Sequence, residues 1–119
     1  MKPYAALLYA AYNDTSYQGE IMAKTPEKKV KDKVVALLKQ HGAYYFYPVT
    51  GGFGMSGVPD IVACYRGTFI GIECKAGNNK PTALQEKNLQ MIHDSGGIAL
   101  VINEDNIADV MSTLSQLDA

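Results

Sequence analysis

Cysteine is scarce in this chain of 119 residues, which contains only Cys64 and Cys74. Two cysteines are too few for a disulfide-stapled fold, and no CxxC pair suggests a structural zinc site. Both cysteines fall within apolar segments that are typical of strands. We therefore expect two reduced, buried thiols in a cytoplasmic protein.

Long apolar runs are also missing. The longest spans residues 4–12, which is too short to cross a bilayer, so no membrane association is expected. The glycine-rich segment 50–57 is not followed by Gly-Lys-Ser/Thr, which excludes a Walker-type nucleotide loop. Its glycines would let a phosphate backbone approach closely, although a flexible connector is an equally good interpretation.

Charge is distributed unevenly, although the formal net charge is only −1. Residues 24–87 contain ten lysines and arginines against five acidic residues, whereas the tail from residue 103 has four acids and no base. This asymmetry favours a basic surface that contacts phosphates. An ordinary solvated helix surface is the alternative.

The order of predicted elements is helix, three strands, helix, strand, helix. Thr25-Pro26 begins the first helix and Gly42 ends it, as a cap, a first-turn proline and a terminal glycine predict. The last strand follows a helical crossover, so it should pair in parallel with the strand that ends near Lys75. We predict an α/β fold, a mixed sheet of about four strands flanked by helices, over residues 22–119. Residues 1–21 are predicted to be an appendage.

Two carboxylates are predicted to meet on a hairpin. If Arg66-Gly67 is a two-residue turn, Tyr65 pairs with Thr68 and the same register sets Asp60 opposite Glu73. Like charges at such positions destabilise a sheet unless a cation relieves them. Side chains alternate along a strand, so Lys75 shares the face of Glu73 and Cys74 points away.

This arrangement suits a divalent-metal site that hydrolyses a phosphodiester. Mg²⁺ prefers oxygen ligands, which Asp60, Glu73 and the backbone carbonyl of Cys74 would supply. Lys75 would position the attacking water or stabilise developing negative charge. Glu27 points toward the core side of the first helix, and we expect it to extend the site directly or through a metal-bound water.

Gln85 has two competing interpretations. It lies in the apolar arc of the second helix, which would direct it into the site. It also stands three residues after Thr82, which is the position that a capping box requires. Candidate DNA contacts, by their charge or their place beside the site, are Lys28, Lys31, Ser56, Gly57, Lys80 and Thr82.

The motifs Val58-Pro59-Asp60-Ile61-Val62 and Ile72-Glu73-Cys74-Lys75, followed by Gln85, resemble those of the VRR-NUC family of the PD-(D/E)xK nuclease superfamily. The resemblance spans residues 26–102, and Glu27 also matches a motif position. It implies a restriction-endonuclease-like core and cleavage of DNA that depends on Mg²⁺ or Mn²⁺. Stand-alone members resemble Holliday-junction resolvases, which implies a homodimer acting on branched DNA in a bacterial cell or a phage-infected host.

Three other functions are compatible with the sequence. A restriction-type or nicking enzyme on duplex DNA would use the same core. A non-catalytic DNA-binding module is disfavoured because each expected catalytic side chain is present. A hydrolase of small phosphoesters is disfavoured by the basic excess of residues 24–87, which suits a polymeric anion.

Overall fold

The computed structural model describes residues 24–49 and 56–119, and within them the predicted order of elements is confirmed. The elements are α2 (Pro26–His41), β1 (Tyr44–Phe46), β2 (Ile61–Tyr65), β3 (Thr68–Cys74), α3 (Ala83–Asp94), β4 (Ile98–Ile102) and α4 (Ala108–Leu117). The predicted appendage, residues 1–21, and most of the glycine-rich segment lie outside the described residues. The assignment of residues 1–21 stays a prediction.

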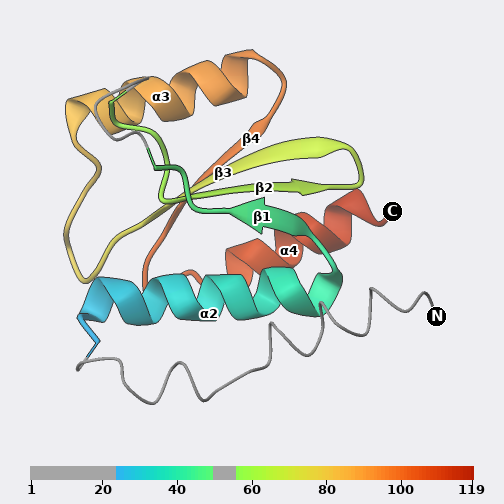
Figure 1. The fold of residues 1–119 in the computed structure, drawn as a ribbon, viewed down its shortest axis with the longest axis horizontal. Coiled ribbons are helices and arrows are strands. Elements are labelled where there is room, and N and C mark those ends of the chain that lie inside the picture. Colours follow the sequence, from blue (N-terminus) through green and yellow to red (C-terminus); the bar gives the residue numbers. More distant parts are fainter. Residues whose placement is uncertain (1–23, 50–55) are drawn as a thin grey trace.

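The four strands form one mixed sheet in the order β1-β2-β3-β4. β1 and β3 both pair antiparallel with β2, and β4 pairs parallel with β3. A parallel pair requires a crossover connection, and α3 supplies it. Figure 1 shows α3 on one face of the sheet, with α2 and α4 on the other. The predicted α/β class is therefore confirmed.

The main core lies between the sheet and the helices α2 and α4. Alternate residues of β3, Ile70, Ile72 and Cys74, point into this core and are at most 1% exposed. Val34 and Leu38 of α2 pack there, as their helical spacing predicts. This core covers one face of the sheet, and the side chains of the other face point toward α3 or solvent.

The β2–β3 hairpin has the predicted register, since Tyr65 pairs with Thr68 and Ile61 with Ile72. Arg66 and Gly67 form the turn with φ of 51° and 77°, the positive values that a type I′ hairpin requires. In α2, the side chain of Thr25 caps the helix at Lys28, and Gly42 ends it at φ 75°. These local signals fix where the strands and α2 begin and end.

Two sequence-based expectations need correction. The tyrosine-rich segment 43–49, which has the composition of a single strand, forms one only over Tyr44–Phe46, because it leaves the sheet before Pro48, which has no N–H for a ladder. Cys64 is exposed rather than buried. It points to the face that carries α3, and α3 packs mainly on β3 and β4. Among the described residues, no helix has the length and apolar character needed to span a bilayer.

Candidate active site

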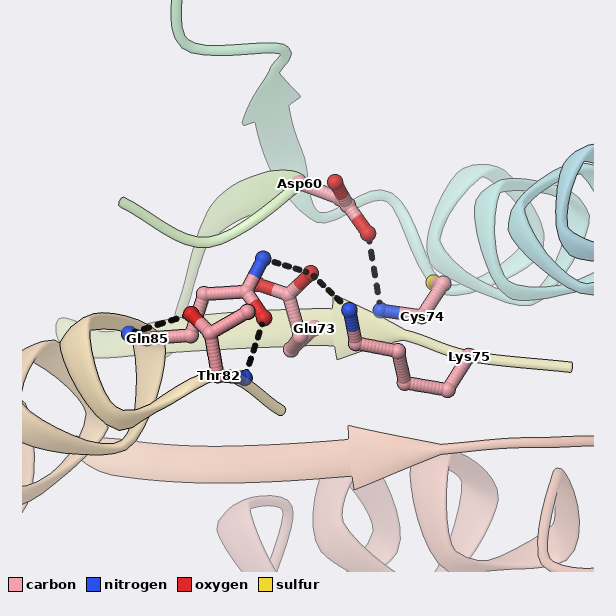
Figure 2. Close-up of polar contacts among 6 residues, drawn as sticks. All are labelled: Asp60, Glu73, Cys74, Lys75, Thr82 and Gln85. Carbon is pink, nitrogen blue, oxygen red and sulfur yellow. Dashed lines mark hydrogen bonds and ion pairs between the residues drawn. The ribbon is translucent and has the colours of Figure 1, made fainter. Parts of the chain in front are cut away.

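Asp60 and Glu73 lie next to each other at the end of the β2–β3 hairpin. The strand ladder stops at Ile61 and Ile72, and Asp60 occupies a bend just before β2. The register alone suggested that the two acids form a ladder pair, but they do not. Instead, Oδ2 of Asp60 accepts a hydrogen bond of 2.9 Å from the backbone N–H of Cys74 (Figure 2). This bond holds the Asp60 carboxylate over β3, beside Glu73.

Glu73 is a buried carboxylic acid, with only 1% of its surface exposed. Its Oε1 accepts a hydrogen bond of 3.2 Å from Nε2 of Gln85 and lies 3.9 Å from Nζ of Lys75. Its Oε2 is buried and has no hydrogen-bond partner among the described residues. A buried carboxylate oxygen without a partner is costly, and such an atom commonly marks a ligand or ion site.

The pKa of Glu73 is raised to about 8. Burial is the main cause, and the nearby carboxylate of Asp60 adds to the shift. Lys75 acts in the opposite direction, and the more distant charge of Glu27 raises the pKa slightly further. Near neutral pH Glu73 therefore retains a proton, as a buried carboxyl group beside a second carboxylate does.

Lys75 and Cys74 lie on opposite faces of β3, as predicted. The side chain of Lys75 is 14% exposed, and its backbone N–H donates to the carbonyl of Ile102. The thiol of Cys74 faces the core, and burial raises its pKa to about 12. Cys74 can therefore offer only its backbone to the site, whereas Lys75 brings an ammonium group to the carboxylates.

Gln85 fulfils both of the roles that the sequence left open. Its Oε1 accepts a hydrogen bond of 2.9 Å from the N–H of Thr82, and the side chain of Thr82 accepts one of 3.2 Å from the N–H of Gln85. The same amide donates to Glu73 through Nε2 (Figure 2). The capping box therefore orients the Gln85 amide, and the start of α3 is coupled to the buried acid.

Glu27 lies apart from this group. It occupies the first turn of α2, behind the sheet, and is partly buried. No three histidine, cysteine or acidic side chains of residues 24–49 and 56–119 come together as a metal-binding cluster, so Glu27 does not join Asp60 and Glu73 directly. Its charge raises the pKa of Glu73, and its contribution through a metal-bound water stays a prediction.

The remaining donors suit a hard divalent cation. Asp60 and Glu73 provide carboxylate oxygens, one of which is the unpartnered Oε2 of Glu73. The backbone carbonyl of Cys74, the residue after Glu73, is the third candidate oxygen ligand. Mg²⁺ takes oxygen ligands and usually keeps several waters, so it needs few protein ligands. A cation here would also offset the repulsion that keeps the pair protonated.

The predicted DNA-contacting lysines have different surroundings. Lys28 pairs with Asp32 at 2.6 Å, and Lys24 pairs with the same carboxylate at 2.7 Å. Nζ of Lys31 lies 5.8 Å from the centre of the Tyr47 ring. Asp32 therefore neutralises part of the basic excess of α2. Lys80, in the loop before α3, is exposed.

Ser56 and Gly57 lie against the start of α3. The carbonyl of Ser56 accepts a hydrogen bond of 3.0 Å from the side chain of Asn88. Gly57 has φ 77°, and a Cβ atom there would meet the backbone of Leu84 at 2.9 Å. Sequence analysis missed Asn88, a buried polar residue one turn after Gln85. Its signal was a polar side chain within the apolar stripe of α3.

Glu104 was also missed. Its carboxylate accepts hydrogen bonds of 2.9 and 3.2 Å from the backbone N–H of Gly77, and the side chain of Asn103 donates to the Gly77 carbonyl at 3.4 Å. These bonds hold the turn that follows Lys75 against the β4–α4 loop. Sequence spacing gave no signal for this contact, because the two loops are far apart in the chain.

Comparison with known proteins supports the fold. No protein-family model matches the chain, and no curated protein sequence matches it. A solved structure described as a "VRR_NUC domain protein" superposes with a TM-score of 0.62 at 21% identity, covering 80% of this chain and 92% of that one. The likeness to the VRR-NUC family that the motifs predicted is confirmed at the level of the fold.

Proposed function

We propose that this chain is a metal-dependent DNA endonuclease that hydrolyses phosphodiester bonds in branched or four-way-junction DNA as a homodimer. The observation that carries this proposal is the buried Glu73, held against Asp60, Lys75 and Gln85 with one carboxylate oxygen unpartnered. Such a group costs stability unless it serves a ligand, and a divalent cation beside a phosphodiester is the ligand it suits.

In this proposal Asp60, Glu73 and the carbonyl of Cys74 would hold Mg²⁺ or Mn²⁺, which would lower the pKa of water and offset charge on the phosphate. The protein residues create the setting for that chemistry. The N–H of Cys74 orients Asp60, and the Gln85 amide orients Glu73. In this proposal the ammonium of Lys75, 3.9 Å from Oε1 of Glu73, orients a water or stabilises negative charge that develops on the phosphate oxygens.

DNA is the proposed substrate for two reasons. Residues 24–87 carry a positive excess that suits a polyanion, and the structure of similar fold bears the description VRR_NUC domain protein. The dimer and the junction preference rest on symmetry, because one small domain with one site cuts one strand, whereas a four-way junction needs two cuts related by a twofold axis. A cytoplasmic setting belongs to the same proposal.

Cleavage of a panel of labelled DNAs tests the proposal. The panel comprises duplex, flap, splayed-arm and four-way-junction DNA, each with Mg²⁺, with Mn²⁺ and with EDTA. The wild-type protein should cut branched DNA only with a divalent cation, and Lys75→Ala should cut at least about 100-fold more slowly, as loss of a group that stabilises the transition state does. Lys29→Ala is the matched control, because it removes an equal charge from an exposed position on α2.

Each alternative function gives a different result. Equal activity of Lys75→Ala and wild type would refute the proposed mechanism. Uniform cutting of plain duplex would identify a restriction-type or nicking enzyme. Tight binding of DNA without cleavage under any metal condition would identify a non-catalytic binding module.

A further inference from the structure

One half of the sheet face that carries α3 is open to solvent and aromatic. We call it the aromatic face and define it by Tyr44 and Phe46 of β1, Val62 and Cys64 of β2, and Phe69 of β3. The strand registers set these residues side by side, since Tyr44 pairs with Cys64, Cys64 with Phe69, and Phe46 with Val62. Tyr44 is 71% exposed, and Phe46 and Phe69 are each 47% exposed.

The position of α3 explains why no described helix covers this half of the face. Ile92 of α3 packs over Gly71 of β3, where a Cβ atom would meet it at 2.5 Å. Leu89 and His93 face Ala99 and Val101 of β4, where they line a shared groove. α3 therefore covers the β3–β4 half of the face, and Gly71 lies at the edge of the covered area.

The aromatic face lies on the same side of the sheet as the candidate active site, with Ile92 and Pro59 packed over Gly71 between the two. Phe69, Gly71 and Glu73 alternate along β3 and point to the same side of the sheet. Four residues of strand separate Phe69 from Glu73, or about 13 Å. A few nucleotides span this distance, because bases stacked as in B-DNA rise about 3.4 Å per step. A DNA strand with its phosphate at Glu73 therefore has its neighbouring bases within reach of the rings.

The chemistry of the face suits bases better than a duplex backbone. Except for Glu73 itself, β1, β2 and β3 contain no acidic residue. The three rings are spread over two strands with the smaller Val62 and Cys64 between them, which leaves flat apolar surface. Exposed aromatic rings on a sheet stack with unpaired bases, whereas the paired bases of a duplex have no free face to offer.

We propose that the aromatic face binds unpaired bases of the DNA strand that flanks the scissile phosphodiester. This inference rests on the proposed nuclease function and narrows its substrate to DNA with a single-stranded segment beside the cut. A second copy of the chain is the competing occupant. The five residues of the aromatic face fall well short of the roughly 20–30 residues per partner that a stable protein interface uses.

Alkylation of Cys64 tests the occupant in the wild-type protein. Cys64 is exposed at the centre of the face, and the other cysteine, Cys74, is fully buried. N-ethylmaleimide should therefore modify Cys64 alone, as read by mass spectrometry. With EDTA present to prevent cleavage, saturating single-stranded DNA should slow this modification several-fold, and duplex DNA at equal occupancy should not.

Substitutions that separate ring stacking from simple apolar contact provide a second readout. Phe69→Leu keeps an apolar side chain and Phe69→Tyr keeps the ring. Affinity for labelled single-stranded DNA, measured by fluorescence anisotropy in EDTA, should fall roughly 5- to 100-fold for the leucine variant. It should stay near wild type for the tyrosine variant, and duplex affinity should be equal in all three proteins. Phe46→Leu repeats the test at a second ring, so a folding defect at one position does not decide it.

Several results would overturn the inference. One is alkylation of Cys64 that single-stranded DNA leaves unchanged, and another is equal DNA affinity of the leucine and tyrosine variants. Alkylation that slows as protein concentration rises without DNA would assign the face to a second copy. Because these measurements need no cleavage, they fail or succeed separately from the Lys75→Ala experiment that tests the nuclease proposal.

Discussion

Replacing Glu73 with glutamine should stabilise the metal-free protein, and more strongly as the pH rises. The pKa of Glu73 is raised from 4.5 to about 8, mainly by burial and next by Asp60. Between these values the folded protein retains a proton that the unfolded chain has released, so the free energy of unfolding falls as pH increases. Glutamine stays neutral beside Asp60 and keeps an acceptor for Gln85, so it imitates the protonated acid at every pH.

The size of the effect follows from the same two pKa values. A tenfold change in acidity corresponds to about 1.4 kcal/mol. Near pH 4.5 the wild type and Glu73→Gln should therefore have similar free energies of unfolding. At pH 7 the variant should be more stable by about 3 kcal/mol, and above pH 8 the difference should level off at about 5 kcal/mol.

Urea unfolding at pH 5, 6, 7 and 8 in EDTA measures this difference. Glu86→Gln, at an exposed position of α3, is the control and should show no comparable trend. Adding Mg²⁺ should raise the stability of the wild type and leave Glu73→Gln nearly unchanged, because a ligand stabilises only the state that binds it. A stability difference that stays constant from pH 5 to pH 8 would refute the account of Glu73 as a buried acid that keeps its proton near neutral pH.

Two further predictions concern α3 and the turns. Gln85→Glu should keep the acceptor for Thr82 but lose the donor to Glu73, so cleavage should slow at least tenfold while circular dichroism shows the helix intact; unchanged cleavage would limit Gln85 to capping. Gly57→Ala should reduce the free energy of unfolding by about 2–3 kcal/mol, because its Cβ atom would meet backbone. Gly67 has the same φ of 77°, but a Cβ atom there would meet nothing within 4 Å, so Gly67→Ala should reduce the free energy of unfolding by only about 1 kcal/mol. Equal losses in urea unfolding would contradict the steric explanation for Gly57.

The sequence predicted the fold well where local signals agree. The caps of α2, the Arg66-Gly67 turn and the Thr82–Gln85 box each mark a boundary that the structure has. Predictions failed where tertiary contacts decide. Nothing local shows that α3 packs on only half of the sheet, and the exposure of Cys64 depends on that packing.

The sequence predicted which residues of the hairpin form the candidate site, but it did not predict the contacts between them. Alternation along β3 correctly separated Lys75 from Cys74. Register alone suggested that Asp60 continues the ladder, whereas the chain bends there and Asp60 binds the N–H of Cys74 instead. Helical periodicity directed Glu27 toward the core, yet it cannot tell which side of a sheet a helix will cover.

Among the described residues, the side chains that bond to Glu73 or most change its pKa come from one stretch, residues 60–85, whereas α2 and α4 pack on the other face of the sheet. The candidate site residues and the helices that support the sheet therefore belong to separate parts of the chain. Substitutions among the apolar residues of α2 and α4 should alter the melting temperature without altering which DNA is cut. These two helices are therefore free to diverge in sequence while residues 60–85 are retained.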